Sequence, residues 1–212
     1  MPITVKELFN SVGKEIMGQV KWNEKINCSL PGVYCVAISS KEDVLETIEE
    51  YPVSVNKIEE WIEYVPNMKI DGNKPTVEAV VERLNKFWLP KETILYIGKA
   101  GTSLRDRVNQ YYNTKLGDKR PHAGGHWLKT LDNLNELNVF WTVSGDKDAE
   151  ELEQELLRKF VESIDYNSEL YDDEHPFPFA NLEHPKGKRK IFRVSQPRKR
   201  CSGRITKIRI RK

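Results

Sequence analysis

An α+β fold with a small antiparallel sheet flanked by helices is predicted by the order of periodic segments along this 212-residue chain. Three segments carry β-branched and aromatic residues in period two: residues 30–40 (LPGVYCVAISS), 93–98 (TILYIG) and 137–143 (LNVFWTV). Segments with the apolar spacing of helices precede, separate and follow them. This order predicts one sheet of about three strands, covered by helices.

The first predicted element is a short helix over residues 2–16, which Thr4 can cap. The chain begins with neither the basic stretch nor the apolar block of a signal peptide, and it has no run of about 18 apolar residues that would suit a membrane span. Cys28, Cys35 and Cys201 form no CxxC motif, which is typical of reduced thiols. We therefore expect a cytoplasmic protein that does not enter a membrane.

Residues 40–91 separate the first two predicted strands and differ from them in character. Three stretches (SKEDVLETIEE, VNKIEEWIEYV and TVEAVVERLNKFWL) have helical spacing and many acidic residues, and Pro52 and the run DGNKP separate them. We expect a helical insertion of roughly fifty residues. Its acidity makes it a poor surface for DNA, so it would shape specificity, mediate dimerisation, bind another protein or be purely structural.

Two helices follow the second predicted strand. The first begins with Thr102 or Ser103 as its cap, and the second, which is strongly amphipathic, begins with Asp146 or Asp148. Between them lies a glycine-rich, basic loop, residues 113–127. This loop has the composition of a segment that approaches another molecule closely.

Residues 186–212 differ from the rest of the chain in charge. They hold 13 of the 34 basic residues and no acidic one, which leaves 21 basic against 32 acidic residues, a net charge of −11, in the remainder. A basic extension on an acidic body suggests a polyanionic partner, most often nucleic acid, although it could also be a solvated tail. Its end, GRITKIRIRK, alternates like an edge strand. We interpret residues 1–212 as one domain with the 40–91 insertion and this basic extension.

Arg107 lies on the flank of the inward face of the helix that is predicted to begin after Thr102 or Ser103. At 100° per residue, Leu104, Val108 and Tyr111 share that face, whereas Arg105 lies elsewhere on the helical wheel. A partly buried guanidinium needs an anion. That anion is either a carboxylate of the protein or a phosphate of a ligand.

Glu153 lies inside the apolar stripe of the amphipathic helix that is predicted to begin after Asp146 or Asp148. It follows Ala149 by one turn and precedes Leu157 by one turn. A carboxylate in a buried stripe must be neutralised, paired or bound to a cation, and a carboxylate oxygen suits Mg²⁺ or Mn²⁺. A structural ion pair with Arg107 is the alternative.

Two tyrosines lie in the first two predicted strands. Tyr34 alternates with Val36 and Tyr96 with Ile94, so each tyrosine is expected to point the same way as its apolar neighbours. Strand tyrosines are usually core residues, but each hydroxyl also requires a partner. Together with Lys99 and the inward arginine and glutamate, they indicate a site.

These strands resemble the motif pair of the GIY-YIG endonucleases. The first half-motif is Gly-Val-Tyr at residues 32–34, and the second is Tyr-Ile-Gly at residues 96–98, followed by Lys99. The stretch YIGKAGTSLRDRVNQYY is most similar to the nuclease domain of the bacterial excision-repair enzyme, with one extra loop residue. The resemblance implies a GIY-YIG fold in which the helical insertion lengthens the connection between the half-motifs.

Further positions match the family in the same order along the chain. The family's arginine, followed four positions later by tyrosine or histidine, matches Arg107 and Tyr111, and its metal-binding glutamate matches Glu153. Its terminal asparagine best matches Asn181 in PFANL, ahead of Asn167. The resemblance implies a catalytic set of seven residues: Tyr34, Tyr96, Lys99, Arg107, Tyr111, Glu153 and Asn181.

The resemblance implies hydrolysis of phosphodiester bonds with Mg²⁺ or Mn²⁺ held by Glu153. The ion would act as a Lewis acid, Arg107 would hold the non-bridging phosphate oxygens, and Tyr111 would orient the water or the phosphate. An unperturbed tyrosine or lysine has a pKa near ~10 and needs a cation or desolvation to act as a base near neutrality. The general base is one of three residues: Tyr34, Tyr96 or Lys99.

We therefore expect a metal-dependent endonuclease that acts on double-stranded DNA. A sequence-specific type II restriction enzyme is the leading hypothesis, because the additional segments elaborate the nuclease core and no separate DNA-binding module is recognisable. A repair, homing or branched-DNA nuclease and a catalytically silent nucleic-acid-binding module are the alternatives. A homodimer would allow symmetric cleavage of a palindromic site.

Contacts to DNA outside the reaction centre are expected from the loop 113–127 and from the basic extension. Basic side chains there can bind phosphates, and the glycines of the loop allow the backbone to approach DNA closely. The two histidines of the loop are not interpreted as a metal pair, because a Gly-Gly loop lacks rigid spacing. The expected contacts are Lys115, Lys119, Arg120, His122, His126, Arg198, Lys199 and Arg200.

Overall fold

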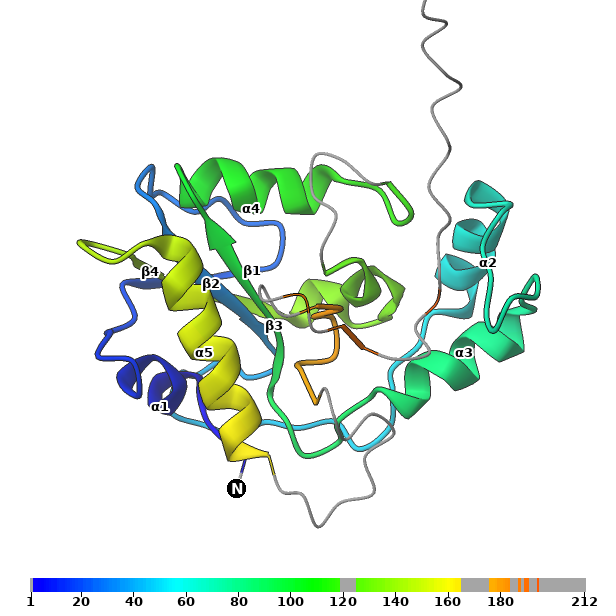
Figure 1. The fold of residues 1–212 in the computed structure, drawn as a ribbon, viewed down its shortest axis with the longest axis horizontal. Coiled ribbons are helices and arrows are strands. Elements are labelled where there is room, and N and C mark those ends of the chain that lie inside the picture. Colours follow the sequence, from blue (N-terminus) through cyan, green and yellow to red (C-terminus); the bar gives the residue numbers. More distant parts are fainter. Residues whose placement is uncertain are drawn as a thin grey trace, which may run out of the picture.

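The protein is an α+β structure with helices around one sheet (Figure 1). The sheet has four antiparallel strands in the order β1-β4-β2-β3. The computed structural model describes residues 2–118, 125–164 and 176–183, together with residues 187, 189, 190 and 194. The strands are β1 (Gly18–Lys21), β2 (Gly32–Ala37), β3 (Ile94–Ala100) and β4 (Asn138–Val143). Three of them are the predicted strands.

The fourth strand, β1, is not among the predicted ones. It pairs with β4, with Gly18 opposite Trp141 and Lys21 opposite Asn138. Its four residues, GQVK, alternate between half-buried and exposed positions, which is too short a pattern to stand out in the sequence. The prediction of about three strands is therefore corrected to four.

Three helices, α1, α4 and α5, begin at one of the cap residues that the sequence suggests. Thr4 caps α1 and forms a capping box with Glu7, Ser103 caps α4 through the amide of Asp106, and Asp148 caps α5 through its side chain. The first helix is shorter than the predicted 2–16. The helices are α1 (Val5–Asn10), α2 (Val55–Tyr64), α3 (Val77–Lys86), α4 (Leu104–Asn113) and α5 (Ala149–Ser163), with the 3₁₀ helices η1 (His126–Thr130) and η2 (Leu134–Glu136).

The two faces of the sheet contact different sets of helices. α1 and α5 lie together on one face, where Val33, Cys35 and Ile97 are buried with Leu156 and Phe160 of α5. On the other face, α4 contacts β2 and β3, and the insertion helix α2 contacts η1 and α3 further out (Figure 1). Residues of α4, η1, α2 and α3 share one hydrophobic cluster with this face of the sheet. The sheet therefore separates α5 from α4 and holds them at fixed positions.

A β-bulge changes the side-chain alternation that we expected in β3. The pairing shifts between Val36 opposite Tyr96 and Ala37 opposite Ile94, which leaves Leu95 as an extra residue. Tyr96 therefore packs on the face towards α4, whereas Ile94 packs on the face towards α1 and α5. The expectation that Tyr96 and Ile94 point the same way is wrong because a bulge reverses the alternation.

The insertion is only partly helical. Residues 55–64 and 77–86 form the two expected helices α2 and α3, but residues 40–50 contain no helix. They run as an irregular segment that ends at Tyr51, whose hydroxyl is 2.5 Å from the Thr130 hydroxyl. The backbone of this segment is bonded to distant parts of the chain instead, because the Glu42 carbonyl accepts from the Lys6 amide and the Ile48 carbonyl from the Trp88 indole, so helical spacing alone does not decide its conformation.

The insertion contributes to the same core as the candidate catalytic tyrosines. Ile58 and Trp61 of α2 and Leu84 of α3 are buried in one hydrophobic cluster with Tyr34 and Tyr96. The backbone of the insertion is also bonded to the core, because the amide of residue 54 donates to the Thr130 carbonyl and the amide of residue 132 to that of residue 52. Removing residues 40–91 would therefore remove part of the core itself.

Within the part of the chain that the structure describes, no helix is long and apolar enough to cross a membrane.

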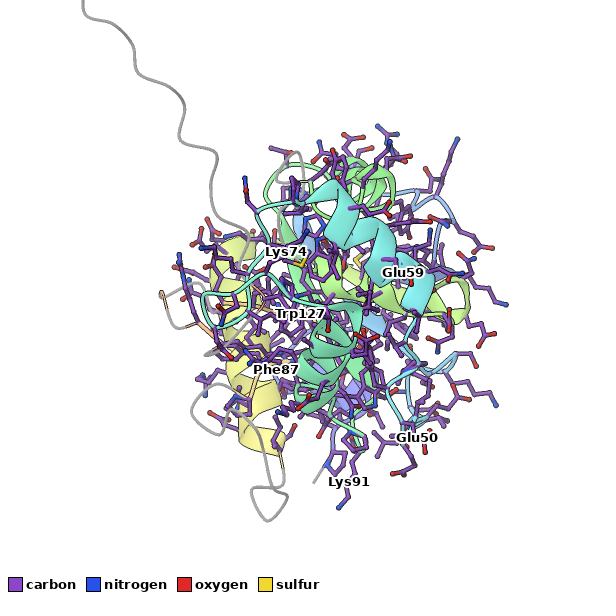
Figure 2. All side chains as sticks on the ribbon, turned by 90° about the vertical axis from the view of Figure 1, so that its right-hand side faces the viewer. Glu50, Glu59, Lys74, Phe87, Lys91 and Trp127 are labelled. Atoms are coloured by element: carbon purple, nitrogen blue, oxygen red, sulfur yellow. The ribbon has the colours of Figure 1, made fainter. Side chains whose placement is uncertain are left out.

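We predict that Trp61→Ala destabilises the protein, because Trp61 is 2% exposed and its loss leaves a cavity in the core shared with Tyr34. The expected loss in the free energy of unfolding is about 3–5 kcal/mol, measured by urea denaturation. Glu59, on the exposed side of the same helix (Figure 2), is the matched control. Glu59→Ala should change stability by less than about 0.5 kcal/mol. Equal effects of the two substitutions would contradict the structural role of the insertion.

Candidate active site

Tyr34 and Tyr96 lie side by side on the face of the sheet towards α4. Tyr34 is in the central strand β2 and Tyr96 in the adjacent strand β3, and their ring centroids are 5.9 Å apart. The side chain of Tyr34 is fully buried and that of Tyr96 is 6% exposed. The register of the two strands therefore brings the tyrosines of both half-motifs together.

Gly98 provides the space for these two rings. It pairs directly opposite Tyr34, and a Cβ atom at this position would lie 2.7 Å from Cε1 of Tyr96 and 2.8 Å from Cζ of Tyr34. Real Cβ atoms do not approach other heavy atoms so closely. The glycine of the second half-motif is therefore required by the packing of the two tyrosines.

Helix α4 adds Tyr111 and Arg107. Leu104, Val108 and Tyr111 are buried, and Arg107 is half-buried on the flank of the same face, as the helical wheel predicts. The ring of Tyr111 lies 5.3 Å from that of Tyr96. Tyr111 thus extends the tyrosine pair into a row of three rings.

The Tyr111 hydroxyl donates a hydrogen bond to the carbonyl of Gly125. Gly125 has a φ of 70°, in the left-handed region, and a Cβ there would collide with the Tyr111 hydroxyl. Tyr111 is fully buried, so this contact ties the end of the loop to the tyrosine row. In this arrangement Tyr111 packs against Tyr96, and its role in orienting water or phosphate stays a prediction.

Helix α5 places two carboxylates beside Lys99 of β3. The Lys99 ammonium lies 2.8 Å from Oε2 of Glu150 and 3.7 Å from Oε2 of Glu153. The Glu153 side chain is 13% exposed and that of Glu150 is 55% exposed. Glu153 is thus the buried member of the pair, as its position in the apolar stripe predicts.

The pKa of Glu153 is raised to about 7, chiefly by burial. The Glu150 carboxylate also contributes to the rise, whereas Lys99 and Arg107 act against it. A carboxyl group with this pKa is protonated in a large fraction of molecules at neutral pH. A cation next to Glu153 would be needed to keep it fully ionised.

Burial also raises the pKa of all three tyrosines of the row above the ordinary value. The Glu153 carboxylate raises the pKa of Tyr34 and of Tyr96, whereas the Arg107 guanidinium lowers both. Arg107 and Glu153 therefore have opposite electrostatic effects on the same two hydroxyl groups from different helices.

Asn181 supports β3 from its outer edge. Its side-chain oxygen accepts a hydrogen bond from the Ile97 amide at 2.9 Å, and its amide donates to the Ile97 carbonyl at 2.8 Å. The amide of Ala180 donates to the Leu95 carbonyl beside it. Asn181 thus positions the strand that carries Tyr96 and Lys99. Both the oxygen and the NH₂ group of its side chain are hydrogen-bonded to the backbone of Ile97.

Of the predicted DNA contacts, two lie among the described residues. Lys115 is exposed at the end of α4, which is compatible with binding to phosphate. His126 is only 5% exposed at the start of η1, which does not favour a direct contact with DNA, so its assignment stays a prediction. Six others lie outside the described residues: Lys119, Arg120, His122, Arg198, Lys199 and Arg200.

Two contributors to the site were not predicted from the sequence. Glu150 lies outside the apolar stripe and resembles an ordinary exposed carboxylate, although its position one turn before Glu153 could have drawn attention to it. Gly125 is one of several glycines in its loop. Only its tertiary contact with Tyr111 distinguishes it.

Comparison of the chain with protein-family models, with curated proteins and with solved structures gave no significant match.

We predict that Gly98→Ala destabilises the protein by about 1–3 kcal/mol, because the added methyl group overpacks the two tyrosine rings. Gly101 lies three residues later, and a Cβ there would meet no atom within 4 Å. Thermal or urea denaturation should therefore show little change for Gly101→Ala. A Gly98→Ala protein as stable as the Gly101→Ala protein would contradict the packing described here.

Proposed function

We propose that this chain is a metal-dependent endonuclease of the GIY-YIG type that hydrolyses phosphodiester bonds of double-stranded DNA. The observation that carries the proposal is that β3 brings together side chains from three further elements. The ring centroid of its Tyr96 lies 5.9 Å from that of Tyr34 of β2 and 5.3 Å from that of Tyr111 of the helix that carries Arg107, and its Lys99 lies 3.7 Å from Glu153 of α5. A guanidinium, a carboxylate and two hydroxyl groups around one strand suit a phosphate and an attacking water.

Arg107 is suited to bind the phosphate. Its side chain is half-buried on α4 and lies close enough to both tyrosines to lower their pKa. A planar guanidinium can hold two non-bridging oxygens and stabilise the negative charge that grows on them. Arg105, two residues earlier, is exposed and pairs with Asp106 at 3.3 Å, so it is not assigned to the site.

Glu153 fits a divalent cation that also binds the substrate. Its carboxylate is mostly buried, and burial opposes its ionisation, so a cation bound to it would relieve that cost. Among the described residues no group of three or more histidine, cysteine or acidic side chains could hold a metal. Mg²⁺ commonly uses one or two carboxylates and completes its shell with water and phosphate oxygens. When bound, the ion would supply Lewis-acid stabilisation of the leaving oxygen.

Tyr34 and Tyr96 are suited to donate hydrogen bonds. Because burial raises their pKa, both hydroxyls remain protonated near neutral pH. They would orient the attacking water or a phosphate oxygen, and either becomes a base only if cationic neighbours lower its pKa. Lys99 is paired with Glu150. The assignment of the general base among Tyr34, Tyr96 and Lys99 stays open to experiment.

A sequence-specific type II restriction enzyme is the activity that we propose within this class. The exposed Lys115 lies at the end of the helix that carries Arg107, where it can bind a neighbouring phosphate. Discrete fragments from plasmid and phage DNA would support this activity. Cleavage of branched or damaged DNA alone would favour a structure-specific nuclease, and binding without cleavage would favour a silent nucleic-acid-binding module.

We predict that Arg107→Lys lowers the rate of plasmid cleavage with Mn²⁺ by at least about 100-fold, because a lysine cannot hold two phosphate oxygens in the fork geometry. Arg105→Lys is the matched control on the same helix and should change the rate by less than about twofold. Equal rates for the Arg107→Lys and unsubstituted proteins would exclude Arg107 from the reaction. Cleavage that persists in Glu153→Gln would refute the metal assignment.

We also predict that Mn²⁺ binding depends on pH through Glu153. The pKa of about 7 means that protons occupy the carboxylate below neutrality and leave as the pH rises. The apparent affinity for Mn²⁺ should therefore increase about tenfold between about pH 6 and pH 8 and then level off. Isothermal titration calorimetry measures it directly. The Glu153→Gln protein should lack this dependence, and a flat profile for the unsubstituted protein would contradict the assignment.

A further inference from the structure

We infer that Glu150 is a positioning residue that holds the Lys99 ammonium away from Glu153 and so leaves the Glu153 carboxylate open to a cation. The inference rests on the proposed function and goes beyond it by assigning a role to a residue outside the seven that the family resemblance implies. Glu150 acts through Lys99 and need not contact the substrate.

The geometry of the three side chains carries the inference. Lys99 projects from β3 towards α5, where Glu150 and Glu153 lie one turn apart. The Lys99 ammonium is in close contact with Glu150, at 2.8 Å, and is 3.7 Å from Glu153. One lysine therefore lies between two carboxylates and is bound mainly by the more exposed one.

The different burial of the two carboxylates accounts for the preference of the Lys99 ammonium for Glu150. The Glu153 side chain is 13% exposed against 55% for Glu150, so an ion pair with Glu153 requires more desolvation of both charged groups. Glu150 pairs with Lys99 at a smaller desolvation cost.

Loss of the Glu150 charge should let Lys99 move to Glu153. The remaining carboxylate is already within 3.7 Å, and a charge-assisted hydrogen bond would close that gap to about 2.8 Å. Lys99 would then occupy the oxygen that a divalent cation needs. The expected result is weaker metal binding although no metal ligand has been changed.

A crystal structure of the metal-free Glu150→Gln protein tests the first step. Glutamine has the same shape without the charge, and we expect the Lys99–Glu153 distance to fall below about 3.0 Å. Glu155→Gln is the matched control, because Glu155 pairs with Lys147 at 2.9 Å on the same helix. Its structure should keep the Lys99 position. An unmoved Lys99 in Glu150→Gln would overturn the inference whatever the function of the protein.

Mn²⁺ binding followed by electron paramagnetic resonance tests the second step. Glu150→Gln should raise the dissociation constant about threefold to tenfold, whereas in a Lys99→Met background the same substitution should change it by less than about twofold. An equal loss in both backgrounds would mean that Glu150 attracts the cation by its own charge, and would overturn the inference. A merely structural role of Glu150 would not depend on Lys99.

The two proposals fail in different ways. If the unsubstituted protein binds no Mn²⁺, or if Glu153→Gln binds it equally well, the metal site of the proposed function is refuted, and the role of Glu150 towards the cation falls with it. If Glu153→Gln abolishes binding while the Glu150 effect is the same with and without Lys99, only the inference about Glu150 is refuted.

Discussion

The register of β2 against β3 is the constraint on which the candidate site depends. It places Gly98 opposite Tyr34 and so leaves room for two tyrosine rings on one face of the sheet. The same register turns Lys99 to the opposite face, towards α5. A slip by one residue would exchange the faces and separate all of these groups. The hydrogen bonds between Asn181 and Ile97 hold the outer edge of β3 in that register.

The candidate site contains several charged and polar side chains, each of which would cost free energy to bury alone. A carboxylate in an apolar stripe, an arginine on the flank of a buried helix face and three buried tyrosines each cost free energy when they are isolated. Here Arg107 opposes the pKa shifts that burial and Glu153 impose on Tyr34 and Tyr96. Mutually compensating charges in a mostly buried setting are typical of sites that bind a charged ligand.

The insertion, residues 40–91, has an acidic surface but also contributes buried side chains to the main core. Its acidic surface gives it the character of a separate unit, yet Trp61 and Leu84 belong to the same hydrophobic core as the tyrosines. Trp127 of η1 joins this core, where its ring lies 5.2 Å from that of Phe87 (Figure 2). The Lys190 ammonium lies over both rings at 5.3 Å. The insertion therefore shares an aromatic core with Tyr34 and Tyr96 of the site.

The sequence by itself determined the cap of the first helix, narrowed the caps of α4 and α5 to two residues each, and indicated three of the four strands and the inward positions of Arg107 and Glu153. These features follow from local periodicity and hydrogen-bonding chemistry. Only the tertiary structure decided the features that depend on distant partners. These are the pairing of the short β1 with β4, the irregular course of residues 40–50, the bulge that separates Ile94 from Tyr96, and the sharing of Lys99 between Glu150 and Glu153. Each of these features depends on contacts between residues that are far apart in the chain, so it cannot be predicted from the pattern of neighbouring residues.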